Sequence, residues 1–380
     1  MDTFTLTDLY AGSPPFASVY LDTESDVADA AARLETRWKD VLRDLRDAGI
    51  GPPAVEALTG ALGEHGAGGT RVLLADADDV VYARSFPEPT DTTTVRTGPL
   101  PHLLPLLELA QSRLPHLVVL TDRSGADLFS FTDEPVADSS STVEPEVWPV
   151  HKVNPGGWQT HRFQHVVEEE WHKSARDIAG HVTRLADRTR ARVVFVAGDV
   201  HAVGLLRKEL PVHVADLVHE IDGSRHPDGS ADEIESQVAA ALSATVLADL
   251  DERLEALQTY VGRGEKSAAA DEVALKGVDG VGATVEALQR AQVETLLLSD
   301  ALERDDAQAP LVYGADATAI ALSPRDLTRL GADPVGSAPQ SDVLVRAALL
   351  TGADVRVVPA THPACPTDGV GALLRFSVTT

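Results

Sequence analysis

The sequence predicts an α/β protein built from three domains. Short apolar runs rich in valine and leucine alternate along the chain with longer stretches in which apolar residues recur every three or four positions. The first pattern is typical of buried strands and the second of amphipathic helices, and their alternation indicates layered α/β domains. A chain of 380 residues, 43% of them hydrophobic, is long enough for two or three cores. We place the domains at residues 1–145, 146–264 and 265–380.

The first domain is expected to begin with a strand at residues 17–21, followed by a helix at residues 28–48. The helix has an apolar stripe made of Leu34, Trp38, Val41, Leu42 and Leu45. Runs of β-branched and other apolar residues then predict strands at 71–75, 80–83, 117–120 and 126–131. Residues 132–149 are rich in Asp, Ser, Thr and Pro, a composition typical of loops, so we expect the domain to end there.

The second domain is expected to consist of two long helices with strands between them. We predict a buried strand at 192–197, a helix through 205–210 and strand-like segments at 212–214 and 217–218. The helix that opens the domain has a stripe at three- and four-residue spacing: Phe163, Val167, Trp171, Ala175, Ile178, Val182 and Leu185. The helix that closes it, residues 231–261, has the stripe Val238, Leu242, Val246, Leu250, Leu254 and Leu257.

The third domain shows the α/β pattern again. Apolar periodicity predicts helices around 285–288 and 343–350. Continuous apolar runs predict strands at 293–298, 355–358 and 372–376.

Composition limits the classes of function. The net charge of -27 disfavours non-specific binding along nucleic acid, because attraction to phosphate grows with the number of positive charges presented. Cys365 is the single cysteine, which excludes an intrachain disulfide and fits a reducing compartment. The sequence shows neither a long uninterrupted apolar segment nor a basic signal region at its start, so we expect a cytoplasmic protein with no membrane partner.

The tetrapeptide Gly156-Gly157-Trp158-Gln159 is the most informative motif. Two adjacent glycines allow a backbone to approach another backbone or RNA closely, because neither has a Cβ atom. The amide of Gln159 both donates and accepts hydrogen bonds. A turn that precedes a helix is the alternative interpretation of the same residues.

The helix after this motif is a basic island on an acidic chain. Between residues 151 and 192 there are eight lysines and arginines against five acids, together with five histidines. Such an island is a candidate anion contact, and a solvated helix face balanced by neighbouring ion pairs is the alternative. The candidate RNA contacts are Gly156, Gly157, Trp158, Gln159, His161, Arg162, Lys173 and Arg176.

Other motifs point less strongly to chemistry. His161 and His165 have a spacing suited to a metal, but no third ligand is evident, so we predict neither a metal nor a cofactor. Asp199 and His201 follow a predicted strand and suit either an acid/base pair or a helix cap. The run Gly277–Gly282 resembles a dinucleotide loop only weakly, since no strong strand is predicted before it, and we interpret it as a helix-entry or interdomain loop. No phosphate-binding loop motif of nucleotide hydrolases is present.

Three segments together resemble the archaeo-eukaryotic release factor and Pelota superfamily. Gly156–Gln159 is similar to the Gly-Gly-Gln loop of class-1 release factors, with Trp158 inserted before the glutamine. Residues 287–300 and 369–376 resemble the first and closing segments of the third domain of these proteins. The resemblance implies a release-factor-like middle domain and a third domain similar to ribosomal L7Ae proteins that docks a translational GTPase. The first domain lacks a stop-codon motif and is divergent.

With its inserted tryptophan and its divergent first domain, the chain resembles the bacterial branch of the superfamily. This branch includes the ribosome hibernation factor Balon and its actinobacterial relatives. Membership implies occupation of the vacant ribosomal A site, contact with its rRNA, and a nearby GTPase such as elongation factor Tu. We therefore expect a translation factor that acts by occupancy, with no confident catalytic residue. A peptidyl-tRNA hydrolase or rescue factor that uses Gln159, and a non-ribosomal stress interaction protein, are the alternatives.

Overall fold

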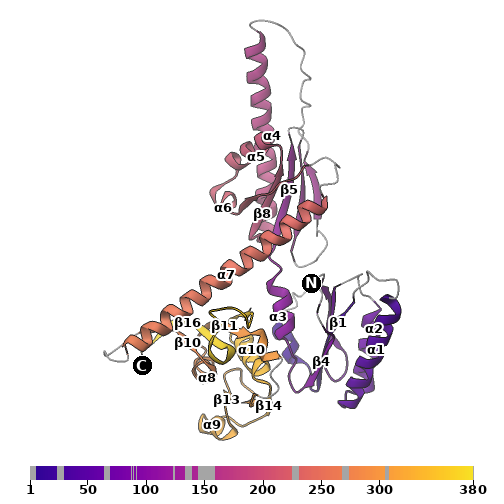
Figure 1. Cartoon of the computed structure of the whole chain (residues 1–380), viewed down its shortest axis with the longest axis vertical. Helices are drawn as coiled ribbons and strands as arrows, with labels where there is room; N and C mark the ends of the chain where they lie inside the picture. The colour runs from indigo at the N-terminus through magenta and orange to yellow at the C-terminus, as the bar shows by residue number, and fades with distance from the viewer. Residues whose placement is uncertain are drawn as a thin grey trace. The chain divides into compact units, whose positions relative to one another are not determined.

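The chain is organised into two compact units. In the computed structural model, unit 1 comprises residues 1–111 and 248–380, and unit 2 comprises residues 112–247. Both contain helices and strands, so the predicted α/β class is confirmed (Figure 1). In the part of the chain that the structure describes, no helix is long and apolar enough to cross a membrane. The described residues are 6–23, 30–63, 69–86, 88, 90, 92–122, 125–132, 139–143, 159–224, 231–267, 274–303 and 308–379.

The first block of unit 1 is a four-stranded sheet of order β3-β2-β1-β4. Its elements are η1 (Leu6–Ala11), β1 (Phe16–Asp22), α1 (Ala30–Asp47), α2 (Pro52–Leu62), β2 (Thr70–Ala75), β3 (Val80–Phe86), β4 (Thr94–Gly98) and α3 (Leu104–Gln111). Both neighbours of β1 run antiparallel to it. One face of this sheet is covered by α1 and α2, and the stripe residues Trp38, Val41 and Leu45 are buried there as predicted.

The last block of unit 1 contains a second sheet, of order β10-β16-β11-β15, and a small sheet of order β13-β12-β14. Its elements are β10 (Ala274–Asp279), α8 (Val281–Gln289), β11 (Val293–Ser299), η2 (Asp300–Glu303), β12 (Leu311–Tyr313), β13 (Ile320–Ala321), α9 (Pro324–Arg329), β14 (Gly336–Ala338), α10 (Gln340–Leu350), β15 (Asp354–Val358), η3 (Thr367–Gly369) and β16 (Val370–Thr379). Strands β11 and β15 are parallel, whereas β16 runs antiparallel to both β10 and β11.

Helix α7 (Ala231–Ser267) covers one face of this second sheet with its C-terminal half. Leu250, Leu254 and Leu257 are buried there against strand residues. The helix approaches closely because glycine lies beneath it: a Cβ atom on Gly371 would stand 2.9 Å from a methyl carbon of Leu257. The opposite face of the sheet packs against α8 and α10.

The two blocks of unit 1 share one hydrophobic core. Tyr20, Val72 and Leu74 from the first sheet pack in the same cluster as α3 and as residues of α8, α10 and the second sheet. Helix α10 is buried at every position from Ser341 to Ala348, as expected of a helix enclosed on all sides. The first block is therefore an integral part of unit 1 and not a separately folded domain.

A cluster of buried polar groups lies beside this shared core. The Nδ1 atom of His102 donates to the Asp342 carboxylate across 2.8 Å, and the side chains are only 6% and 7% exposed. The Tyr20 hydroxyl donates to the His102 carbonyl, and the His102 amide donates to the Ser18 hydroxyl. Burial raises the pKa of Tyr10 in this region well above its usual value, so its hydroxyl stays neutral.

Unit 2 is built on a five-stranded sheet of order β7-β6-β5-β8-β9. Its elements are β5 (His116–Asp122), β6 (Gly125–Phe131), β7 (Ser139–Val143), α4 (Gln159–Thr189), β8 (Val193–Gly198), α5 (Val200–Glu209), α6 (Val212–Ala215), β9 (Val218–Glu220) and the first part of α7. Strands β5, β8 and β9 are parallel, and β6 and β7 are antiparallel additions.

Helices cover both faces of this sheet (Figure 1). The α4 stripe residues Ala175, Ile178 and Val182 are buried as predicted, and α5 and α6 lie on the same side of the sheet. The other face packs against Ile234 and Val238 of α7. The single apolar stripe of α7 thus serves a core in each unit.

The predicted domain boundary at residue 145 is wrong in one respect. It separates β5, β6 and β7 from β8, whereas β5 and β8 are hydrogen-bonded neighbours in one sheet. The units divide instead between residues 111 and 112 and between 247 and 248. The loop-like composition of residues 132–149 does not mark the end of a domain, because strand β7 lies within this range and pairs with β6.

A second correction concerns residues 212–214, which form the short helix α6 and not a strand. Pro211 stands at the N-cap of α6, where its fixed φ suits helix entry and its missing N–H costs nothing. Helices α2, α3 and α9 and the strands β4, β7, β10 and β12–β14 were not predicted. Most of them are short, and short apolar runs give little periodicity.

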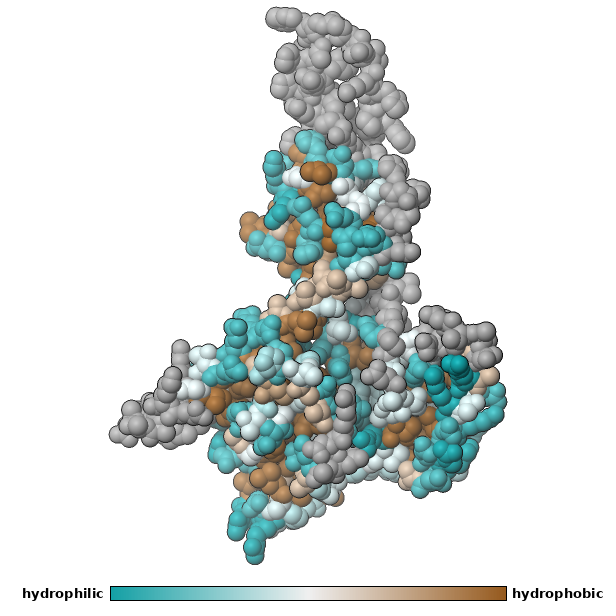
Figure 2. Space-filling model, in the orientation of Figure 1, coloured by the Kyte–Doolittle hydropathy of each residue, from teal (hydrophilic) through white to brown (hydrophobic). Residues whose placement is uncertain are grey.

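Exposed apolar side chains are distributed over both units. Val200, Val212 and Phe376 are 88%, 76% and 63% exposed. Hydrophobic and hydrophilic residues are interspersed over the face of each unit seen in Figure 2. Apolar residues exposed singly are ordinary for folded proteins.

We expect Asp342→Ala to destabilise unit 1 by about 1–3 kcal/mol, because it leaves the buried Nδ1–H of His102 without an acceptor. Urea titration followed by circular dichroism, with amide exchange of Val19 as the probe of unit 1, measures this. Asp333→Ala is the matched control: Asp333 is exposed, so its loss is expected to change stability by less than about 0.5 kcal/mol. Equal stability of the two variants would contradict the proposed importance of the buried pair.

Candidate functional site

Helix α4 connects the predicted RNA-contacting motif to the sheet of unit 2. The helix begins at Gln159 and continues without interruption for 31 residues. Residues 156–158 lie outside the described residues, as do the side chains of Gln159, His161 and Arg162. Ala175 is the first residue of α4 described as buried, so 16 residues of helix precede it. At 1.5 Å per residue this is about 24 Å of helix.

Lys173 and Arg176 are the candidate contacts whose side chains the structure describes. Both are exposed on α4, one turn apart. The Nε atom of Arg176 lies 3.1 Å from the Glu209 carboxylate at the end of α5, whereas Lys173 has no ion pair within the described residues. The two cations are therefore not equivalent, because an anion must compete with Glu209 for Arg176 but not for Lys173.

Strands β5 and β8 approach closely where they end beside α4. Gly198, the last residue of β8, has a φ of 141°, a conformation that side chains with a Cβ atom rarely adopt. A Cβ atom there would stand 1.7 Å from the carbonyl oxygen of Thr121. The Asp199 amide donates to that same oxygen. Only glycine fits this position, which fixes the direction in which the chain enters α5.

Asp199 and His201 form a helix cap. The Asp199 carboxylate accepts hydrogen bonds from the backbone amides of His201 and Ala202 at 3.0 and 3.2 Å. This is the N-cap arrangement that stabilises the first turn of a helix. The cap interpretation of the sequence is confirmed, and the Asp199 carboxylate is turned toward the backbone of α5.

A shallow pocket lies at this end of the sheet, between α4 and α5. Its polar lining comes from Thr121, Asp122, Ser174 and His201, and its apolar lining from Ala175, Ile178, Ala202, Leu205 and Leu206. The carboxyl ends of parallel strands are the usual position of ligand sites in α/β sheets. Here Asp122 accepts from the Gly125 amide and so closes the β5–β6 turn, which gives this carboxylate a structural role.

Two further motifs of the sequence suggested a metal site and a dinucleotide loop. Among the described residues no group of three or more His, Cys, Asp or Glu side chains is placed to hold a metal, and the side chains of His161 and His165 lie outside them. Contrary to expectation, the run Gly277–Gly282 includes the end of a strand, β10, and it continues through Gly280, the N-cap of α8, into the first turn of that helix. The carboxylate of Asp279 fills this turn by accepting from the amides of Gly280 and Thr367, so it serves as the helix-entry loop that was predicted.

His116 is the first residue of strand β5 and lies in a partly buried aromatic cluster. Its ring stacks on Phe131 with centroids 4.6 Å apart and meets Phe195 edge to face. Burial lowers the pKa of His116 below its usual value, opposed by the hydrogen bond to the Leu114 carbonyl, so the ring is neutral at pH 7. This histidine is part of the core and not part of an anion site.

Sequence comparison assigns unit 2 to a known class. A family model described as "Bacterial archaeo-eukaryotic release factor family 2" matches residues 115–263, a range that begins just before β5 and ends within α7. The uncharacterized proteins MT2704 and Rv2629 of Mycobacterium tuberculosis are each 30% identical over 98% of this chain and 96% of their own length. The protein is thus a bacterial relative of the archaeo-eukaryotic release factors. Within that superfamily, the match to family 2 covers residues 115–263.

Several solved structures align with most of the chain at low sequence identity. Saccharomyces cerevisiae Dom34, a translation termination-like factor that interacts with Hbs1, is 11% identical with a TM-score of 0.42, covering 99% of this chain and 91% of its own. Archaeoglobus fulgidus Pelota is 15% identical with a TM-score of 0.34, covering 82% and 80%. A ribosome-bound archaeal Pelota is 15% identical with a TM-score of 0.34, covering 98% and 95%. The family assignment rests on the sequence matches.

We expect opposite effects from two glycine substitutions around α5. Gly198→Ala should destabilise unit 2 by at least about 3 kcal/mol, since the added methyl group meets the Thr121 carbonyl and the backbone is strained. Gly204→Ala, on the exposed side of α5 with open space around it, should stabilise by up to about 1 kcal/mol. Thermal unfolding and amide exchange of β8 measure both effects. A well-tolerated Gly198→Ala would disprove the close approach of β5 and β8.

Proposed function

We propose that this protein is a ribosome-binding translation factor that occupies the vacant A site and holds the ribosome idle, as a hibernation factor does. The observation that carries the proposal is the family match over residues 115–263, a range that includes the Gly156–Gln159 motif and the whole of α4. The part of the chain that matches the family model is thus the part that contains the diglycine motif and the long helix after it.

The length of α4 supports a role for the motif at a distance from the folded core. Ala175 is the first α4 residue described as buried, and about 24 Å of helix lies between it and Gln159. A support of this length suits a motif that has to enter a narrow RNA-walled cavity. The -27 charge of the chain keeps the rest of the surface from binding RNA non-specifically, so the contact has to be local.

Occupancy is favoured over hydrolysis by the residue between the diglycine and the glutamine. Trp158 moves the amide of Gln159 one position along the chain and adds a large indole ring. In the proposed complex Gly156 and Gly157 permit the close approach and Trp158 stacks on a base. Arg162, Lys173 and Arg176 neutralise phosphates, and His161, next to Arg162 in the sequence, is a further RNA contact. Base stacking of this kind contributes about 1–3 kcal/mol.

The proposed partners are the rRNA of the A site and a translational GTPase such as elongation factor Tu, which would dock on the third domain. The part of unit 1 that contains α8, α10 and the second sheet is the proposed docking module. Neither a cofactor nor a metal enters the proposal, because it has no chemical step.

Co-sedimentation with 70S ribosomes tests the proposal. We expect the protein to pellet with ribosomes at low salt and less at moderate salt, with the GTPase supplied. Trp158→Ala should weaken binding about 5- to 150-fold, which corresponds to the loss of about 1–3 kcal/mol of stacking. The absence of co-pelleting at any salt concentration would rule out the ribosome as partner, and a non-ribosomal stress interaction protein would then be the better interpretation.

The described cations allow a sharper test of the phosphate contacts. Lys173→Ala should reduce the slope of log affinity against log salt by about 1, the effect of losing one phosphate contact. Arg176→Ala should reduce it by less, since Arg176 is already paired with Glu209. Lys39→Ala on α1 is the matched control, an exposed lysine in the first block. Equal slopes for all three variants would place the contact elsewhere.

A peptidyl-tRNA hydrolase or rescue factor is the second candidate, because Gln159 still follows the two glycines closely. Release of labelled peptide from stalled ribosome complexes separates it from occupancy. We expect no release by the native protein beyond the rate in buffer. Release that is abolished by Gln159→Ala would establish hydrolysis instead.

A further inference from the structure

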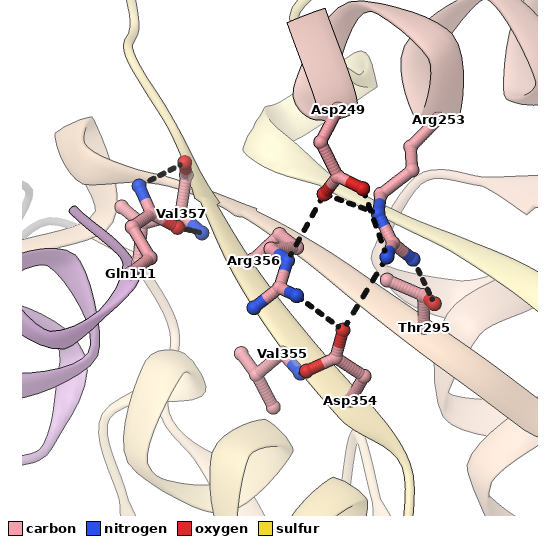
Figure 3. A network of polar contacts seen from close by, with 8 residues as sticks. All are labelled: Gln111, Asp249, Arg253, Thr295, Asp354, Val355, Arg356 and Val357. Carbon is pink, nitrogen blue, oxygen red and sulfur yellow. Dashed lines mark hydrogen bonds and ion pairs between the residues drawn. The ribbon is translucent and has the colours of Figure 1, made fainter. Parts of the chain in front are cut away.

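A side chain hydrogen-bonds to the outer edge of strand β15. Strand β15 ends the order β10-β16-β11-β15, a position that leaves the backbone groups of one edge without a strand partner in that sheet. Gln111, the last residue of α3, fills part of this edge. Its Nε2 donates to the Val357 carbonyl and its Oε1 accepts from the Val357 amide, both at 2.9 Å (Figure 3). One side-chain amide thus makes the two hydrogen bonds that a neighbouring strand would make.

A ring of four alternating charges holds α7 to the same strand. Asp249 and Arg253 from α7 face Asp354 and Arg356 from β15 (Figure 3). Around the ring, Arg253 lies 2.9 Å from Asp249 and 3.8 Å from Asp354, and Arg356 lies 3.0 Å from Asp354 and 3.6 Å from Asp249. Arg253 also donates to the hydroxyl of Thr295, a buried residue of β11.

Both contacts lie where the chain passes between the units. Gln111 is the last residue of unit 1 before Ser112 begins unit 2, and Asp249 is the second residue after the chain returns at Ala248. Apolar packing ends just short of both points: Leu109 is the last α3 residue packed against the shared core, and Leu250 is the first α7 residue buried in the second sheet's cluster. Beyond the apolar cores, these polar contacts therefore hold the chain in place at the two points where it crosses between the units.

We propose that residues 354–357 of β15 form a two-point clamp that fixes both chain crossings to unit 1. Rotation of unit 2 is then confined to residues 112–115 and to the part of α7 between Val238 and Asp249, while unit 1 acts as the rigid base. The clamp is polar and its charged side chains are 24–43% exposed, so salt weakens it. This inference does not depend on the proposed ribosomal function.

Two measurements test the clamp in the full-length chain. Amide exchange at Val357 reports the Gln111 contact directly, and we expect Gln111→Met to accelerate it at least tenfold. The width of the distance distribution between spin labels reports rotation of unit 2. Labels are placed at Ala283→Cys in unit 1 and Lys208→Cys in unit 2, both exposed positions, in a Cys365→Ser background. The double variant Gln111→Met with Arg356→Met should at least double this width.

Arg290→Gln is the matched control, because it removes an exposed ion pair with Glu286 on α8 and leaves β15 intact. It should change neither measurement. Slow exchange at Leu297 of β11 shows that unit 1 is folded in each variant, and the single variants Gln111→Met and Arg356→Gln replace the double one if that protection is lost. An unchanged Val357 rate in Gln111→Met, or an unchanged width in a folded variant with fast Val357 exchange, would overturn the proposal.

Discussion

The structure of unit 1 depends on one constraint, the burial of α10 on all sides. From Ser341 to Ala348 this helix has no exposed position, so it requires apolar partners in several directions at once. The second sheet and α8 supply some of them, and η1 and α3 of the first block supply others. Segments from the two ends of the chain are thereby joined in one core, and unit 2 is an insertion between residues 111 and 248. The hydrogen bond from His102 to Asp342 lies in this core and gives it a polar contact that a shifted packing would break.

Much of the fold follows from apolar periodicity. The stripes of α1, α4 and α7 are buried or partly buried wherever their side chains are described, because a helix has to bury its apolar face. Periodicity says which face is buried but not what covers it. The stripe of α7 looks continuous in the sequence, yet Val238 packs in unit 2 and Leu254 in unit 1. Tyr20 likewise gives no sign in the sequence that the last block of the chain covers it. For this reason the sequence suggested three consecutive domains, whereas the structure has two units.

The candidate site was predictable to a different degree. The diglycine motif and the basic helix are local features, and a sequence displays local features directly. The different environments of Lys173 and Arg176 depend on Glu209, 33 residues away along the chain, which spacing alone does not bring near. The sequence gives no sign that position 198 requires glycine, because that requirement comes from the position of the Thr121 carbonyl. Gln111 and the charge ring of β15 join residues more than 100 positions apart, beyond any local pattern.

Unit 1, built around α10, and unit 2, whose long helix α4 follows the diglycine motif in the sequence, are joined at the two crossings of the chain. A cryo-electron microscopy map of the protein bound to idle 70S ribosomes tests the central claim, A-site occupancy, most directly. We expect density for unit 2 in the A site, with Gly156–Gln159 directed to the peptidyl-transferase centre and Trp158 against an rRNA base. Ribosomes with an empty A site, or density for the protein at another position, would contradict it.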